Sequence, residues 1–189
     1  MQYYVKTAYG LSTSSFQNTF LWYVLSLLQG SSEVCPIWSL SSSIQFNVMD
    51  KLYPMAVFPS PRPEVFTERN GESFVDNTTL WETSMTASLP EVVATMTSKA
   101  QAWERGVHVA GGALNLLKTF FYAVSWKYKK NGQPTMQTVS DDPDVAIHLT
   151  QGNTRDRTKS INQVEVTTGK RTLGVSLAPN GSDKTEYEY

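Results

Sequence analysis

A carboxylate lies beside a turn signal in the stretch Phe74-Val75-Asp76-Asn77. The flanking residues 72–75 and 78–81 contain aromatic and β-branched side chains, which favours two strands joined by a hairpin turn at Asp76-Asn77. An Asp held outward at the tip of rigid strands suits a divalent-cation ligand for phosphoryl transfer. An ordinary turn is the alternative, because Asp and Asn both tolerate left-handed backbone.

A helix is expected on each side of this hairpin, on the same face of one sheet. Apolar residues recur every three or four positions over residues 37–52 until Tyr53-Pro54 ends the pattern. Ser88 and Glu91 then form a capping box that opens a helix over residues 89–109. Both apolar stripes are expected to face the core. Their members are Ile37, Leu40, Ile44, Val48 and Leu52 in the first helix, and Leu89, Val92, Val93, Met96, Ala100, Trp103 and Val107 in the second.

The second half of the chain is less regular. Side chains alternate enough over residues 120–129 to predict one strand, closed by a turn at Asn131-Gly132. Residues 137–163 are polar, which indicates a loop-rich insertion.

Composition favours one domain or a domain fragment in a reducing, intracellular compartment, cytoplasmic or nuclear. The chain has 189 residues, of which 40% are hydrophobic, with one cysteine and two histidines, so an internal disulfide and a zinc-type cluster are excluded. The apolar run 20–28 is about half the roughly 20 residues that a membrane span requires, which predicts a buried segment and no membrane anchor. The N-terminal residues do not support a secretory signal.

Charge is unevenly distributed along the chain. The net charge is −1, yet residues 118–171 hold nine Lys or Arg against five Asp or Glu. Such a basic half is expected of a nucleic-acid binder, although a solvated face of mixed charge explains it equally well.

Four segments appear in the order that reverse transcriptases use. They are Gln29-Gly30 followed by Pro36, then Phe74-Val75-Asp76-Asn77, then Gly111 to Lys118-Thr119, and finally Leu173-Gly174-Val175 before the turn Pro179-Asn180-Gly181. Over about residues 29–178 the chain therefore resembles the reverse transcriptases, or RNA-directed DNA polymerases, of eukaryotic retrotransposons, particularly those of diatoms.

The resemblance implies an α+β fold. It would be part of a right-hand polymerase palm, an antiparallel sheet backed by two helices, with a primer-grip-like hairpin. Residues 1–136 would form the partial palm, residues 137–166 a polar insertion or linker, and residues 167–189 the primer-grip-like hairpin and the start of the thumb connection.

The resemblance also implies roles for individual residues. Asp76 would bind Mg²⁺ and Lys118 would stabilise charge on the departing pyrophosphate. Nucleotide and template would contact Gln29 and Gly30, and the primer would contact Leu173, Gly174 and Val175. The expected partners are an RNA template, a DNA primer and deoxynucleotides, together with an upstream palm and fingers that this chain lacks.

Two departures from the family pattern bear on activity. The family supplies one metal-binding Asp from a strand upstream of the segment matched by Gln29-Gly30, and the chain begins after that position. Asn77 stands where a second Asp normally follows Asp76. A two-metal clamp needs carboxylates on more than one element, so we expect a retrotransposon polymerase fragment that is inactive alone. The alternatives are a non-catalytic palm remnant that binds nucleic acid or a partner, and a fragment without a stable fold.

Overall fold

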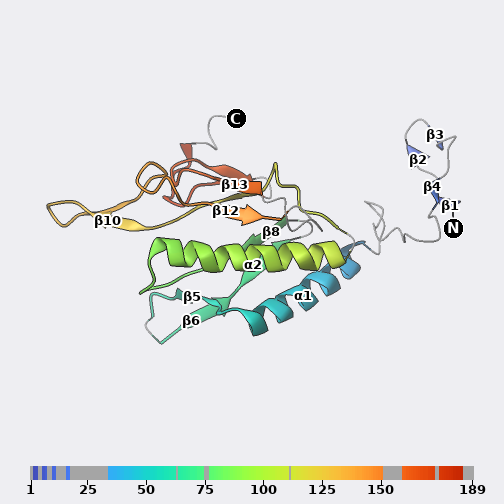
Figure 1. Cartoon of the computed structure of the whole chain (residues 1–189), viewed down its shortest axis with the longest axis horizontal. Coiled ribbons are helices and arrows are strands. Elements are labelled where there is room, and N and C mark those ends of the chain that lie inside the picture. Colours follow the sequence, from blue (N-terminus) through green and yellow to red (C-terminus); the bar gives the residue numbers. More distant parts are fainter. Residues whose placement is uncertain are drawn as a thin grey trace.

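The computed structural model describes the chain over residues 2–3, 6–7, 10–11, 16–17, 34–62, 64–74, 77–110, 112–150, 159–172 and 175–184. In these ranges the chain forms two long helices and fifteen short strands, which confirms the expected α+β class (Figure 1). Neither of the described helices is long and apolar enough to cross a membrane.

The helices are α1 (Val34–Leu52) and α2 (Leu89–Val109), close to the predicted bounds. Tyr53 closes α1 by donating its backbone N–H to the Met49 carbonyl. The predicted capping box opens α2, where the Ser88 N–H donates to Glu91 Oε2 over 2.7 Å. The Ser88 hydroxyl donates to the same carboxylate oxygen, and this bond, followed by the one from the N–H, lowers the pKa of Glu91.

The strands form seven small sheets in the described ranges. Six are antiparallel pairs: β1 (Gln2–Tyr3) with β4 (Phe16–Gln17), β2 (Lys6–Thr7) with β3 (Gly10–Leu11), β5 (Ala56–Pro59) with β6 (Phe66–Arg69), β7 (Gly71–Phe74) with β8 (Asn77–Leu80), β10 (Trp126–Tyr128) with β11 (Pro134–Met136), and β14 (Lys170–Thr172) with β15 (Val175–Leu177). In the seventh, β13 (Lys159–Gln163) pairs antiparallel with β12 (Ile147–Leu149) and parallel with β9 (Phe120–Phe121).

Helix α2 lies at the centre of the fold, between the β12–β13 layer and α1 (Figure 1). On one side Ala100 packs in a buried cluster with Ile147, Leu149 and Ile161. On the other side Met49 of α1 packs with Trp103 and Val107, and the rings of Phe46 and Trp103 are 4.7 Å apart. The two clusters form most of the described core.

The segment predicted as a loop-rich insertion contains part of this core. Strands β12 and β13 both fall within residues 137–163, and their buried residues Ile147, Leu149 and Ile161 pack on α2. The loop prediction is wrong for these residues. The two strands have only three and five residues and lie within a polar sequence. Their apolar positions could therefore not be recognised as core residues before the packing against α2 was known.

The single strand predicted over residues 120–129 is divided into β9 and β10. The residues between these two strands, 122–125, lie outside the ladder. Among them, Tyr122 Oη donates to the Thr168 carbonyl over 2.8 Å. Partial burial of this ring raises the pKa of Tyr122. The turn at Asn131-Gly132 is confirmed, because Gly132 has φ of 79° and donates its N–H to the Lys129 carbonyl.

Helix α1 buries a different face from the predicted one. Of the predicted stripe, Leu40, Ile44, Val48 and Leu52 are 49 to 64% exposed, and the Ile37 side chain lies outside the described residues. Ser42 and Met49 are buried, with Trp38, Phe46 and Tyr53 partly so. These five residues also recur at three or four positions, so α1 carries two stripes and periodicity could not choose between them.

Substitution of adjacent residues in α1 should test this orientation. We expect Met49→Ala to lower the free energy of unfolding by about 2 to 5 kcal/mol, because it empties a buried site, and Val48→Ala to change it by less than about 0.5 kcal/mol. Met49 is 2% exposed and Val48 is 49% exposed. Urea denaturation followed by circular dichroism measures both. A larger loss of unfolding free energy for Val48→Ala than for Met49→Ala would support the orientation predicted from the sequence.

Candidate functional site

The predicted hairpin is present as β7 and β8. Cα partners run from Gly71 and Leu80 to Phe74 and Asn77, so the two residues that join the strands are Val75 and Asp76. Both lie outside the described residues. Asn77 is the first residue of β8, paired with Phe74, and is not the turn residue that the sequence predicted.

The base of the hairpin is clamped to α1. A Cβ on Gly71 would lie 2.4 Å from the Thr79 carbonyl oxygen and 2.9 Å from Cε1 of Phe46, so only glycine allows this approach. The neighbouring Asn70 side chain is buried and donates through Nδ2 to Asp50 Oδ1 over 2.8 Å. Its backbone carbonyl accepts from the Trp81 N–H.

The turn end of the hairpin is hydrogen-bonded to the first turns of α1. Trp38 Nε1 donates to Ser73 Oγ over 3.2 Å, and Ser73 Oγ donates to the Asn77 carbonyl over 3.3 Å. Thr78 Oγ1 also donates to Ser73 Oγ. The sequence did not single out Trp38 or Ser73. The available signal was the position of Trp38 two residues after Pro36, at the start of a helix whose partner was unknown.

The strand ends face solvent. Phe74 and Asn77 are exposed, and the nearby carboxylate of Glu72 accepts from Arg69 Nη1 over 3.2 Å. Within the described part of the chain, no group of three or more His, Cys, Asp or Glu side chains is placed to hold a metal ion.

A buried ion pair holds α2 against the end of the hairpin. The fully buried Lys99 Nζ lies 2.6 Å from Glu82 Oε2 and donates to the carbonyls of Pro54 and Trp81 over 2.7 and 3.1 Å. Glu82 Oε2 has no aligned hydrogen bond, so its contact with Lys99 is a charge contact. The Lys99 ammonium group of α2 therefore joins three segments. The other two are the residue Pro54 after α1 and the residues Trp81 and Glu82 after β8.

The remaining predicted site residues are dispersed. Lys118 is exposed in a turn closed by the Asn115 carbonyl, and among the described residues its side chain has no hydrogen bond or ion pair. Val175 is the first residue of β15, whereas Gln29, Gly30, Leu173 and Gly174 lie outside the described residues. No described hydrogen bond or ion pair joins Asn77, Lys118 and Val175.

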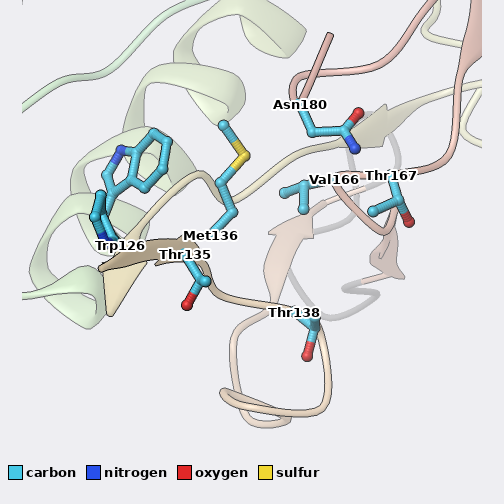
Figure 2. A pocket seen from close by; sticks show the side chains of 8 residues that line it. Trp126, Thr135, Met136, Thr138, Val166, Thr167 and Asn180 are labelled. Carbon is cyan, nitrogen blue, oxygen red and sulfur yellow. The ribbon is translucent and has the colours of Figure 1, made fainter. Parts of the chain in front are cut away.

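Two hollows are present elsewhere on the surface. One, of about 260 Å³, is lined by Phe58, Thr67, Arg69 and Trp81. The other, of about 360 Å³, lies between the β10–β11 hairpin and the C-terminal turn (Figure 2). Of the predicted site residues whose side chains the structure describes, neither Asn77 nor Lys118 lines either hollow.

Comparisons with known proteins do not identify a family or a function for this chain. No protein-family model, curated protein or solved structure matches the chain. The hairpin, its two flanking helices and the dispersed side chains described above are therefore the basis for assigning a function.

Proposed function

We propose that this chain is part of the palm of a retrotransposon reverse transcriptase, an RNA-directed DNA polymerase that acts inside the cell. The observation that carries the proposal is the register of β7 and β8, which leaves Val75 and Asp76 as the connection of a hairpin. That hairpin follows α1 and precedes α2, as the order of the four family-like segments requires.

Asp76 is the proposed metal ligand, and we propose that it forms only part of a Mg²⁺ site. Asn77 replaces a carboxylate with an amide, and the described residues contain no cluster of three metal-ligating side chains. A hard cation that clamps a reacting phosphate needs several oxygen ligands from more than one element. We therefore assign no catalytic step to this chain alone.

The other proposed roles follow the same resemblance. Lys118 is exposed, which leaves its ammonium group available to pyrophosphate. Leu173, Gly174 and Val175 would touch the primer, and the pairing of β14 with β15 supports a hairpin there. Gln29 and Gly30 would contact the template and the incoming deoxynucleotide.

A second candidate function is a non-catalytic palm remnant that binds nucleic acid. Asn77 in place of a carboxylate and the basic composition of residues 118–171 favour it. The two candidates differ in whether a completed palm can extend a primer.

Primer extension on an RNA template should separate these candidates. The unmodified chain should give no product with Mg²⁺ or Mn²⁺, and Asn77→Asp alone should not restore activity, because too few carboxylates are present. A chimera that adds the upstream Asp strand and fingers of a related palm, together with Asn77→Asp, should extend the primer. Extension by the unmodified chain would show that the metal-site argument is wrong, and a folded but inactive chimera would favour the remnant.

A further inference from the structure

The β10–β11 hairpin projects from the fold beyond the N-terminal end of α2 (Figure 1). Trp126 pairs with Met136 and Tyr128 with Pro134, while Lys127 pairs with Thr135. Side chains alternate between the two faces of a hairpin, so one face carries Trp126, Tyr128, Pro134 and Met136. We call these four residues the aromatic face.

The opposite face is braced against the rest of the protein. Lys127 Nζ lies 2.5 Å from Asp141 Oδ1, and the other carboxylate oxygen of Asp141 accepts from the N–H and hydroxyl of Thr138. The bond from Lys127, followed by those from Thr138, lowers the pKa of Asp141 from 3.8 to about 2. Because the pKa is lowered, the brace is intact at neutral pH and is lost only as the pH falls towards 2.

The aromatic face itself is open to solvent. Trp126 is 55% exposed and Tyr128 is 74% exposed, and neither ring packs on another aromatic ring in the described part of the chain. The two rings are two residues apart on one strand, or about 7 Å along it. Two large rings are thus held side by side on an ordered strand, at the cost of leaving apolar surface in water.

The charge on this hairpin has one sign. Residues 126–136 contain three lysines and no acidic residue. Lys127 is paired with Asp141, but Lys129 and Lys130 at the turn are exposed and have no ion pair among the described residues. The free charge at the end of the aromatic face is therefore positive, which complements phosphate.

The hollow of about 360 Å³ continues the aromatic face at the base of the hairpin. Figure 2 shows Trp126 and Met136 on one side of it and Val166, Thr167 and Asn180 on the other. Asn180 Oδ1 accepts from the Ser182 N–H, and its amide nitrogen has no acceptor among the described residues. The hollow thus offers an apolar wall and a hydrogen-bond donor, as a planar base with polar edges requires.

From these features we infer that the aromatic face binds unpaired bases of a single-stranded nucleic acid, with Trp126 and Tyr128 stacking on successive bases and Lys129 and Lys130 contacting phosphates. The inference rests on the proposed function, which supplies nucleic acid as the ligand. It adds that the nucleic acid is single-stranded and names the residues that bind it. Single strands fit best because bases in a duplex stack on each other and do not offer their faces to protein rings.

Fluorescence anisotropy of the full chain with a labelled oligo(U) and with a blunt duplex of equal length tests this inference. The single strand should bind more tightly than the duplex at the same salt concentration. Trp126→Ala and Tyr128→Ala should each weaken oligo(U) binding by about tenfold or more, because each removes one stacked base. Trp126→Phe should retain most of the affinity. Phe66→Ala is the matched control, because Phe66 is a 60% exposed strand aromatic in another hairpin.

Salt dependence separates stacking from phosphate contacts. Replacing Lys129 and Lys130 by Gln should reduce the slope of log affinity against log salt by about 0.7 for each lysine, whereas Trp126→Ala should leave the slope unchanged. Lys51→Gln, in the last turn of α1, is the matched control for charge. Circular dichroism should show that all variants keep the parental fold.

Several outcomes would overturn the inference. They are equal affinity for oligo(U) and duplex, equal effects of Trp126→Ala and Phe66→Ala, and binding of an oligo-Glu peptide but not of oligo(U), which would indicate a protein partner. Failure of the proposed function is a separate result. In that case oligo(U) binding would depend on Trp126 while the chimera extends no primer.

Discussion

Replacement of Asp76 by alanine should abolish primer extension in the chimera that carries the upstream Asp strand, the fingers and Asn77→Asp. The carboxylate supplies an anionic oxygen to a hard divalent cation, and an alanine leaves that coordination position without a protein ligand. Metal stabilisation of charge in a phosphoryl-transfer transition state contributes several kcal/mol, so the rate should fall about a thousandfold or more.

The control for this loss is a second carboxylate on the same hairpin. Glu72 lies on β7, is exposed and pairs with Arg69, so Glu72→Gln should leave the extension rate within about threefold of the parent and cost little stability. Single-turnover extension assays give the rate, and anisotropy with an RNA–DNA hybrid shows whether substrate binding is kept. Parental activity in Asp76→Ala, or an equal loss in Glu72→Gln, would contradict the proposed role of Asp76.

Replacement of Lys99 by methionine should lower the free energy of unfolding by about 3 to 5 kcal/mol. The change leaves the carboxylate of Glu82 and the carbonyls of Pro54 and Trp81 without the ammonium group that they share. A typical domain has only about 5 to 15 kcal/mol of stability in total, so the variant should be close to unfolding at room temperature.

The control for Lys99 is Lys51→Met, because Lys51 is exposed in the last turn of α1. It should change the free energy of unfolding by less than about 0.5 kcal/mol. Adding Glu82→Leu to Lys99→Met should recover part of the loss, since it removes the unpaired buried charge. Guanidinium denaturation gives the free energy of unfolding for the parent protein, the two single variants and the double variant. A loss below about 1 kcal/mol in Lys99→Met would mean that the ion pair does not hold these segments together.

Features with local signals were predictable from the sequence. The capping box of Ser88 and Glu91 marked the start of α2 within one residue, and the Asn131-Gly132 turn followed from glycine at positive φ. The β7–β8 hairpin was also expected, although its strands begin and end one residue earlier than predicted. In each case a few neighbouring residues determine the backbone.

Features that depend on contacts far along the chain were not predictable. Helix α1 has two stripes with large apolar side chains, and the choice between them depends on α2 and on Gly71, through the rings of Trp103 and Phe46. Strands β12 and β13 are short, and their role in the core depends on Ala100 of α2. The partners of Lys99, two carbonyls and the Glu82 carboxylate, lie 17 to 45 residues before it in the sequence, so a lysine in a helix gave no sign of burial.

The candidate site was predictable only in part. The hairpin around Asp76 and the exposed position of Lys118 agree with the roles that the resemblance implied, while those roles stay predictions. The hydrogen bond from Trp38 to Ser73 near the turn of the hairpin was not predictable, because the two residues are 35 positions apart in the sequence and the partner of α1 was unknown.

Mn²⁺ binding to the chimera tests the central claim, that Asp76 is the metal ligand of a polymerase palm, most directly. Calorimetric titration should detect Mn²⁺ binding in the chimera with Asn77→Asp, and this binding should be lost when Asp76 is also replaced by alanine while Glu72→Gln retains it. A chimera that is well folded by circular dichroism, yet binds Mn²⁺ equally well with and without Asp76, or not at all, would contradict the assignment.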